Sequence, residues 1–288
     1  MAPEGLQGQT LKAKSDAELF RHFHAVETAA EARRKRRARA ANFLGRSVLL
    51  LALLGCWWLV AAYYPPVLVP GPGDTWHAFL DGRDTIWGNT PITLLEIFLG
   101  FLSGSVLGIG LGALIAQSRW AEVIVTPYLV VAQAVPKVAL APILIIFLGY
   151  GIGSKVAIAA LIAFFPLLEN TILGLRRVDP DSLRLLQSLG ASKWQVFLKL
   201  RLFSALPLVF AGLRIAAVLA TLGAIVGEFV AGNNGLGALL VISMGTFSTP
   251  LMYATMVVLT VLAFAVYVLV QWLELKALTK YNLAAPGD

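Results

Sequence analysis

Long apolar stretches, separated by short polar segments, recur along most of this sequence. A helix needs about 20 apolar residues to cross roughly 30 Å of hydrocarbon, and each stretch meets that length. Hydrophobic residues make up 58% of the 288 positions and charged residues only 14%, whereas soluble domains average about 45–50% and about 25%. The sequence therefore predicts an all-α integral membrane protein with about six transmembrane helices. We place these spans at residues 43–64, 91–116, 123–148, 155–175, 205–230 and 251–275.

The third span contains Pro127, Pro136 and Pro142. Proline removes a backbone donor and leaves carbonyl groups without partners, which lipid cannot satisfy. We therefore expect this helix to be interrupted and to face protein or a water-filled path.

Polar segments at both ends divide the chain into a basic tail at 1–42, a transmembrane domain at 43–280 and a short tail at 281–288. Composition favours a partly disordered N-terminal tail, and a helix lying on anionic headgroups is the alternative. The single cysteine, Cys56, excludes an intrachain disulfide and a thiolate metal cluster. No metal site is expected, because the histidines are scattered over tail and loop.

Lysine and arginine are distributed unequally between the two sides of the spans, which sets the expected orientation. One side carries the arginine-rich tail at 33–39, the basic cluster at 176–201 and the basic C-terminal end, whereas the other keeps only Arg83 and Lys155. Both termini and the segment 178–203 are therefore predicted to be cytoplasmic. The net charge of +7 is a topology signal, and nucleic-acid binding is the poorer explanation for it.

Several ionisable residues fall inside the predicted spans, namely Glu96, Lys137, Glu169, Arg214 and Glu228. Charges at such depth are costly and usually face a cavity or one another. Lys137 directly follows Pro136, so a cation coincides with a broken helix, as would suit an anionic or carboxylate-bearing solute. We take Lys137, Pro136 and Glu228 as candidates for a translocation path. The alternative is a structural ion pair or a snorkelling side chain, which we favour for Glu169 and Arg214 and slightly for Glu228.

A glycine at every fourth position marks the second span, at Gly100, Gly104, Gly108 and Gly112. Glycines at that interval form a flat stripe that another helix can approach closely. No Gly-Lys-Ser/Thr follows them, so a phosphate-binding loop is not expected and the chain shows no means of hydrolysing ATP. The stripe predicts a packing face.

The polar segment at 178–207 has the signals of two short helices. Asp179 is a suitable N-cap with Pro180 at the first helical position. Gly190 is a natural helix stop, and Ser192 followed by Gln195 predicts a capping box. Helix signals alone leave two interpretations equal, an amphipathic loop on lipid headgroups and a docking element for another protein.

This hairpin resembles the cytoplasmic loop of permease subunits in bacterial ABC importers, in which Glu-Ala-Ala is followed at a short interval by Gly and then by an apolar-rich stretch ending in Pro. Gly190 takes the glycine position and Leu206-Pro207 closes the motif, whereas Arg-Leu-Leu at 184–186 replaces Glu-Ala-Ala. The resemblance is to the nitrate/sulfonate/taurine group with the MetI-like transmembrane fold. The resemblance covers residues 60–278, with a core at 86–275. Outside the hairpin, the residues that match the group are Pro136, Ala139, Pro142, Gly149-Tyr150-Gly151, Gly227-Glu228-Phe229 and Gly235-Leu236-Gly237.

The resemblance implies a multi-pass subunit of the bacterial inner membrane that forms the translocation pathway. Cytoplasmic ABC ATPase subunits, which bind ATP and Mg²⁺, would grip the hairpin, and a periplasmic binding protein would deliver the solute. A second permease subunit would complete the pathway, as a homodimer embedded in membrane lipids. The residues implied in ATPase coupling are Arg184, Leu186, Ser188, Leu189, Gly190, Ala191, Ser192 and Trp194.

Two other classes of function were weighed. A secondary transporter driven by an ion gradient often has inverted repeats with paired broken helices, and the sequence shows one broken region only. A membrane-embedded enzyme would need a convergent set of His, Asp or Ser groups, and none is evident. The resemblance leaves the solute open between a nitrate-, sulfonate- or taurine-like anion and a molecule of the thiamine-precursor or riboflavin type.

Overall fold

The computed structural model describes residues 44–45, 47–232 and 234–280, and the tails predicted at 1–42 and 281–288 lie outside them. The chain forms two compact units, residues 1–63 and 64–288. In the first unit, the apolar helix Ser47–Tyr63 covers most of the first predicted span. All regular elements of the described residues are helical, which confirms the all-α fold class.

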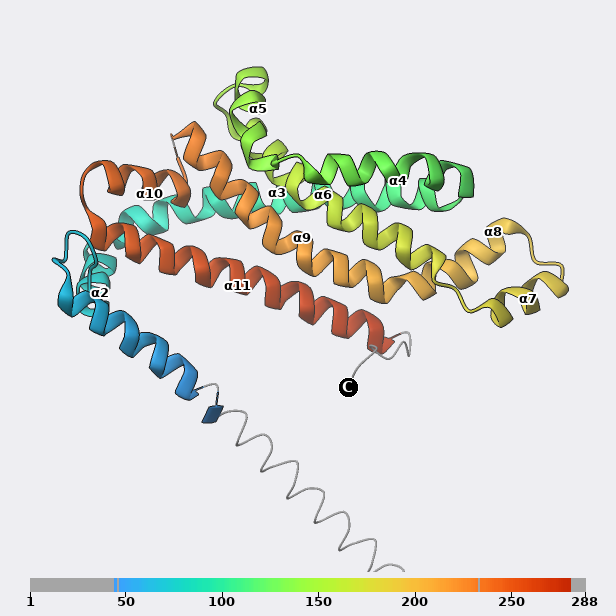
Figure 1. Cartoon of the computed structure of the whole chain (residues 1–288), viewed down its shortest axis with the longest axis horizontal. Helices are drawn as coiled ribbons and strands as arrows, with labels where there is room; N and C mark the ends of the chain where they lie inside the picture. The colour runs from blue at the N-terminus through green and yellow to red at the C-terminus, as the bar shows by residue number, and fades with distance from the viewer. Residues whose placement is uncertain (1–43, 46, 233, 281–288) are drawn as a thin grey trace, which may run out of the picture. The chain divides into compact units, whose positions relative to one another are not determined.

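The second unit is a bundle of long helices with short helices at its ends (Figure 1). The helices long and apolar enough to cross a membrane are α3 (Arg83–Ala116), α6 (Ile152–Arg176), the helix Lys193–Ala231 and α11 (Thr249–Lys280). The bent pair Arg119–Ala134 and Lys137–Leu148 can supply a further span. Four of the predicted spans in this unit are therefore confirmed, with changes at their ends, and the third corresponds to the bent pair.

The second predicted span begins earlier than expected. The helix α3 starts at Arg83, and Pro91 lies inside it. Hydropathy detects only the apolar part of a helix, so the polar turns before Pro91 resemble a loop in the sequence. A short helix, α2 (Pro72–Asp81), precedes α3 and was not predicted.

The interruption of the third span is confirmed at one of its prolines. The helix α4 (Arg119–Ala134) ends before Pro136, and the chain bends by 80° into a short 3-10 helix, Lys137–Leu140, followed by α5 (Ala141–Leu148). Pro127 lies inside α4 and Pro142 in the first turn of α5, where its missing N–H costs nothing. Only Pro136 therefore lies at the break.

The glycine stripe of α3 packs against α6, as predicted. A Cβ at Gly104 would lie 2.7 Å from the Ala160 carbonyl oxygen, and one at Gly108 would lie 2.8 Å from the Leu167 Cβ. Gly223 of the helix α9 (Leu202–Ala231) is equally close to α6 at the neighbouring residue, because its Cβ would lie 2.6 Å from the Ala159 Cα. Helix α6 is thus held between α3 and α9 by close backbone approach, the usual device where lipid gives no hydrophobic drive.

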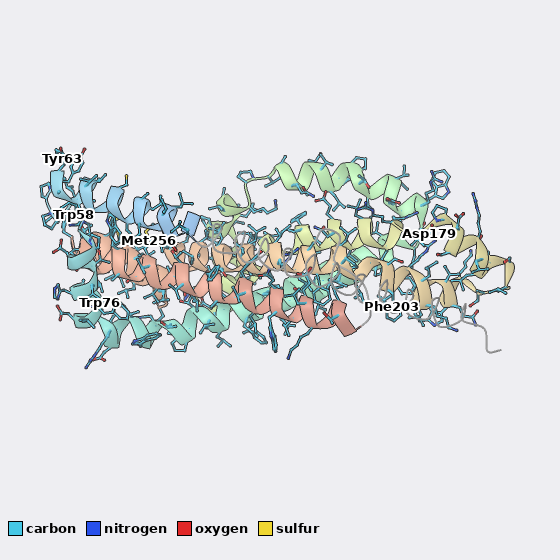
Figure 2. The ribbon with its side chains drawn as sticks, turned by 90° about the horizontal axis from the view of Figure 1, so that it is seen from below. Trp58, Tyr63, Trp76, Asp179, Phe203 and Met256 are labelled. Atoms are coloured by element: carbon cyan, nitrogen blue, oxygen red, sulfur yellow. The ribbon has the colours of Figure 1, made fainter. Side chains whose placement is uncertain are left out.

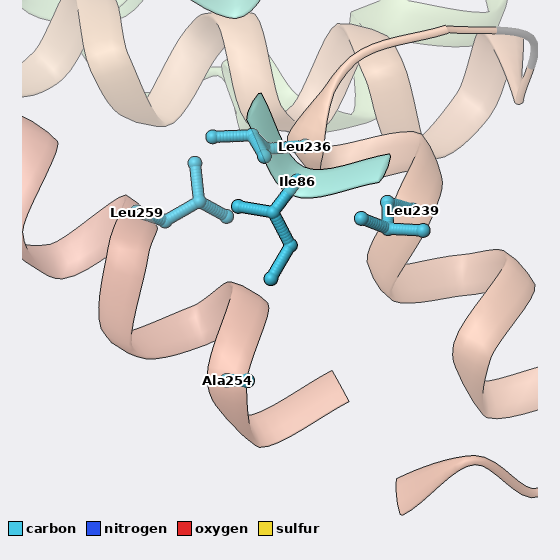
Figure 3. Packing of buried hydrophobic residues seen from close by; sticks show 5 residues of the cluster. All are labelled: Ile86, Leu236, Leu239, Ala254 and Leu259. Carbon is cyan, nitrogen blue, oxygen red and sulfur yellow. The ribbon is translucent and has the colours of Figure 1, made fainter. Parts of the chain in front are cut away.

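A compact apolar cluster holds one end of this unit together (Figure 3). Ile86 at the start of α3 is fully buried against Leu236 and Leu239 of the short helix α10 (Leu236–Gly245) and against Ala254 and Leu259 of α11. The helix α10 was not predicted, because its ten residues are too few to be recognised as a span. The cluster fixes α10 against both longer helices.

The polar hairpin lies at the other end of the unit. Asp179, the first residue of the hairpin, and Trp76 of α2 lie at opposite ends in Figure 2. Large apolar side chains between these ends are exposed, among them Val106, Phe264 and Leu269, as expected for helices that face lipid. The hairpin and α2 are therefore separated along the long axis of this unit.

Candidate functional site

The first helix of the hairpin is α7 (Pro180–Ser188), and its start is capped as predicted. The Asp179 carboxylate accepts hydrogen bonds from the Ser182 N–H at 2.9 Å and from the Ser182 hydroxyl at 2.5 Å. Both bonds favour the charged carboxylate and therefore lower the pKa of Asp179; the bond from the Ser182 hydroxyl has the larger effect and the bond from the Ser182 N–H the smaller. An anion at this position also complements the helix dipole.

The turn between the two hairpin helices depends on Gly190. Its φ of +73° lies in the left-handed region, where residues with a side chain are strained. The Gly190 N–H donates to the Gln187 carbonyl and the Ala191 N–H to the Leu186 carbonyl, both at 3.0 Å. This closes α7 and reverses the chain, as predicted from the glycine.

The second helix begins with the predicted capping box. The Ser192 hydroxyl accepts from the Gln195 N–H at 3.3 Å, and the Gln195 side chain accepts from the Ser192 N–H at 2.8 Å. The helix continues from α8 (Lys193–Val196) through a π-helical turn, Phe197–Arg201, into α9. Residues Lys193–Ala231 thus form one helix, so the predicted hairpin helix and the fifth span are a single element.

Apolar side chains are exposed on the hairpin although its surroundings are polar. Leu185 is 61% exposed, Leu189 73% and Trp194 63%. Of these three, Trp194 lines a cleft of about 460 Å³, together with Leu183, Gln187, Ala191, Lys193 and Arg201 among other residues. Exposed apolar groups around a cleft mark a surface for protein contact.

The hairpin is anchored to the membrane-spanning helices. Phe197 packs on a buried cluster of Ala116, Leu175 and Ala205, which come from α3, α6 and α9. Trp194 stacks on Phe197 with ring centroids 5.6 Å apart. Trp194 is therefore connected through packed side chains to three of the long helices.

A cavity with several polar side chains in its wall lies at the break of the third span, away from the hairpin turn. It has a volume of about 370 Å³ and is lined by Gln133, Lys137, Phe165, Glu169, Asn170 and Ile215, among other residues. The Lys137 ammonium donates to the Gln133 carbonyl at 3.3 Å and lies 4.7 Å from the centre of the Phe165 ring. The Gln133 side-chain amide donates to the Glu169 carboxylate at 3.3 Å. The candidate path residue Lys137 thus lines a cavity, and so does Glu169, for which the structural role was preferred.

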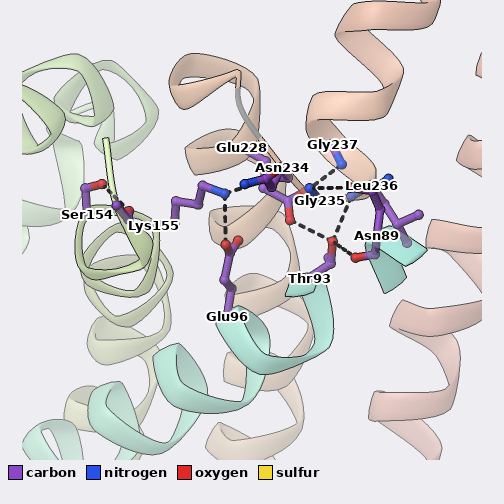
Figure 4. Close-up of polar contacts among 11 residues, drawn as sticks. Asn89, Thr93, Glu96, Ser154, Lys155, Glu228, Asn234, Gly235, Leu236 and Gly237 are labelled. Carbon is purple, nitrogen blue, oxygen red and sulfur yellow. Dashed lines mark hydrogen bonds and ion pairs between the residues drawn. The ribbon is translucent and has the colours of Figure 1, made fainter. Parts of the chain in front are cut away.

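Glu228 lies in a different environment, a fully buried polar network (Figure 4). Its carboxylate accepts from the Thr93 hydroxyl at 2.6 Å and from the Gly237 N–H at 2.5 Å. The Leu236 N–H in turn donates to the Thr93 hydroxyl oxygen at 2.8 Å. This arrangement ties the start of α10 to α3 and α9. It agrees with the structural interpretation, and the role of Glu228 in a path stays a prediction.

The other part of the network is an ion pair. The Lys155 ammonium lies 2.9 Å from the Glu96 carboxylate and donates to the Asn234 carbonyl at 2.8 Å. The sequence placed Lys155 at the outer end of the fourth span and counted it among the charges of that side; in the structure its side chain is buried in α6. Its charge is therefore neutralised inside the protein.

The arrangement of the helices and the hairpin agrees with a comparison of the whole sequence. Residues 104–278 match the family described as "Binding-protein-dependent transport system inner membrane component". This protein belongs to that family.

Relatives of the permease transport several kinds of solute. The riboflavin transport system permease protein of Chloroflexus aurantiacus is 38% identical, over 80% of this chain and 88% of that protein. The formylaminopyrimidine transport permease protein of Halalkalibacterium halodurans is 35% identical, over 82% and 95%. A putative aliphatic sulfonates transport permease protein of Bacillus subtilis is 30% identical, over 89% and 95%.

The fold of the permease is also that of a solved transporter. A chain of the MetNI methionine ABC transporter, in an inward-facing conformation, aligns with a TM-score of 0.59 at 17% identity, over 67% of this chain and 96% of that chain. The expected MetI-like fold is confirmed. The protein is thus a membrane-spanning permease subunit of an ABC importer, as the hairpin motif implied.

Some structurally important residues of the permease were not found from its sequence. Thr93, Asn89 and Lys155 join the buried network, and the Asn89 side chain accepts from the Gly235 N–H at 2.9 Å. Uncharged polar residues near the end of a span look like ordinary boundary residues. The sequence offered one signal for the network: Glu96 lies within a predicted span, a charge within a span needs a partner, and Lys155 is a basic residue of another span that can supply it.

Proposed function

We propose that cytoplasmic ATPase subunits bind the hairpin of this permease and move it during import, while a periplasmic binding protein delivers the solute to the opposite side. The observation that carries this proposal is the exposed apolar hairpin that continues as one helix, Lys193–Ala231, into the membrane. ATP and Mg²⁺ are bound by the partner ATPase, and this chain performs no catalysis. Membership of the importer family supports both kinds of partner.

The orientation follows from charge. Arg177, Arg184, Lys193 and Lys199 gather around the hairpin, whereas Trp76 at the opposite end lies in a helix with acidic residues and no lysine or arginine. Positive charge marks the cytoplasmic side. The permease therefore sits in the bacterial inner membrane with the hairpin and both termini in the cytoplasm.

A second copy of this chain completes the pathway, because closed symmetric pairs are the commonest oligomers. Residues that coat the hairpin are the ATPase contacts, namely Arg184, Leu186, Ser188, Leu189, Gly190, Ala191, Ser192 and Trp194. Lys137 and Pro136 line or border the path of the solute. The relatives support two solute classes, heterocycles such as riboflavin and pyrimidines, and sulfonates.

Reconstitution tests the proposal directly. The permease, its candidate ATPase and its binding protein are placed in proteoliposomes, and ATP-driven solute uptake is measured. Trp194→Ala should reduce ATPase binding and uptake together, whereas Phe264→Ala, which shortens a similarly exposed aromatic residue of α11, should reduce neither. Uptake that persists without ATP but stops when the proton gradient is removed would identify a secondary transporter and overturn the proposal.

A further inference from the structure

The cavity at the break of the third span is lined by polar side chains from both sides of the bend and from α6. Gln133 lies in the last turn of α4 and Lys137 in the short helix after the bend, while Glu169 and Asn170 come from α6. Irregular backbone at membrane depth is stable only where it is covered by protein or lines a water-filled path. Two charged side chains and two amides surround this cavity, so the irregular backbone at the bend lines a space that water can enter.

The charges of the lining oppose a simple anion site. Lys137 is the only cation among the residues that line the cavity in the described part of the chain, and Glu169 supplies a carboxylate in the same lining. The Lys137 ammonium already binds the Gln133 carbonyl at the end of α4 and faces the Phe165 ring. An anionic solute would be attracted to a partly engaged cation and repelled by the neighbouring carboxylate.

The polar side chains of the lining offer hydrogen-bond acceptors as well as donors. The Asn170 side-chain N–H donates to the Pro166 carbonyl at 2.8 Å, and the Gln133 side-chain N–H donates to Glu169. Among the described residues, neither of these two amide oxygens accepts a hydrogen bond, so both can accept one from a solute that brings N–H or O–H groups. A sulfonate group brings acceptors only and would leave these oxygens unpaired.

The rest of the cavity is apolar. Ile162, Phe165, Pro166, Ile215 and Leu219 complete its wall. A mostly apolar wall with a few fixed polar groups is typical of sites for flat organic ligands. Small zwitterions would fill little of that surface.

We propose that this cavity is a solute-binding site of the permease itself and that it accepts uncharged heterocycles carrying N–H or O–H donors, such as an aminopyrimidine or a flavin. The proposal rests on the proposed transport function and revises the expectation of an anionic solute beside Lys137. Glu169 selects against anions by repulsion, and Lys137 and the amides orient the heterocycle. Gln133 joins the two halves of the site across the bend.

The test is a binding measurement on the full-length permease in lipid nanodiscs, without the binding protein. Riboflavin is titrated and followed by its own fluorescence, and an aminopyrimidine, taurine and ethanesulfonate are added as competitors. We expect riboflavin to bind and the aminopyrimidine to displace it, with taurine and ethanesulfonate much weaker. In Glu169→Gln, riboflavin binding should weaken and ethanesulfonate should gain about tenfold in competition, the effect of a modest change in binding free energy.

Matched variants control for indirect effects. Lys276→Met removes a lysine that lies 3.6 Å above the Trp272 ring of α11 outside this cavity, so it should leave binding unchanged, whereas Lys137→Met should weaken it. Failure of riboflavin to bind, equal competition by ethanesulfonate and the aminopyrimidine, or wild-type behaviour of Glu169→Gln would each overturn the proposal. ATP-driven transport in the same preparation is measured in parallel. If transport is retained while binding fails, the solute site is wrong and the importer function stands.

Discussion

The Lys155 ammonium lies 2.9 Å from the Glu96 carboxylate, and these side chains are only 5% and 1% exposed. Removing one partner of such a pair leaves a buried charge without compensation, which costs about 3–5 kcal/mol in soluble proteins. We expect Lys155→Met or Glu96→Gln to lower the thermal unfolding temperature of the purified permease, and the double variant to recover part of the loss. Asp84→Asn breaks the exposed pair with Arg83 and should leave the unfolding temperature unchanged. A single variant at Lys155 as stable as wild type would contradict this assignment.

Replacing Gly190 by valine should weaken the ATPase interaction while leaving the permease inserted. A β-branched residue is strained at a φ of +73°, and the turn will change to relieve that strain. No atom lies within 4 Å of a Cβ at this position, so the effect comes from the backbone and not from a clash. Co-purification with the ATPase measures it. Gly190→Asn should retain most of the binding, because asparagine tolerates the left-handed region. Equal losses of binding in both variants would show that the backbone conformation at Gly190 is not what the ATPase interaction requires.

The glycine stripe offers a comparison within one helix. Gly104→Val should disrupt the contact between α3 and α6, since even a Cβ would approach the Ala160 carbonyl oxygen to 2.7 Å. Overpacking of this kind costs about 1–3 kcal/mol or more. Gly110→Val, which meets open space on the same helix, should be tolerated. Unfolding temperature and monodispersity in detergent distinguish the two, and similar stability would show that the stripe does not hold the helices.

The start of α7 should depend on pH through Asp179. Because hydrogen bonds from Ser182 lower the pKa of Asp179 in the folded hairpin, the charged form stabilises the helix start above the ordinary pKa of aspartate. This contribution is lost as the pH falls through the lowered pKa of the folded state. Amide hydrogen exchange of residues 181–188, corrected for intrinsic rates, should therefore increase at acidic pH. Asp179→Asn keeps a capping side chain that does not titrate, so its protection should stay constant; an identical increase in that variant would rule out Asp179 as the cause.

The hairpin could be predicted from the sequence because its helix caps and its turn depend on residues close together in the chain. Asp179, Gly190 and the Ser192–Gln195 box act through neighbours a few residues away, and these interactions can be recognised in sequence. The continuity of α8 with α9 could not be found in this way. Polar composition at Lys193 and Lys199 suggested a separate surface helix, although a helix can leave the membrane without ending.

The buried network shows the opposite case. Thr93 and Gly237 are distant in sequence and meet at Glu228 only after α10 folds back over α3. Gly235 illustrates why, since a Cβ there would collide with the Glu228 carboxylate. The need for glycine arises from a contact that no local pattern contains.

The π-helical turn at Phe197–Arg201 lies between Trp194 of the hairpin and the membrane-spanning part of the same helix. Each residue of an α-helix advances the chain by roughly 100° around the axis, and a π turn accommodates one residue more than an α turn. Deleting one residue from this turn would leave an ordinary α-helical turn and keep Trp194 facing nearly the same way relative to Gly223, whose Cβ position lies close to Ala159. A deletion of one residue elsewhere between these positions would instead rotate Trp194 by roughly 100° about the axis. Homologous subunits that bind the same ATPase should therefore have this segment either at the same length or one residue shorter with an unbroken α-helix.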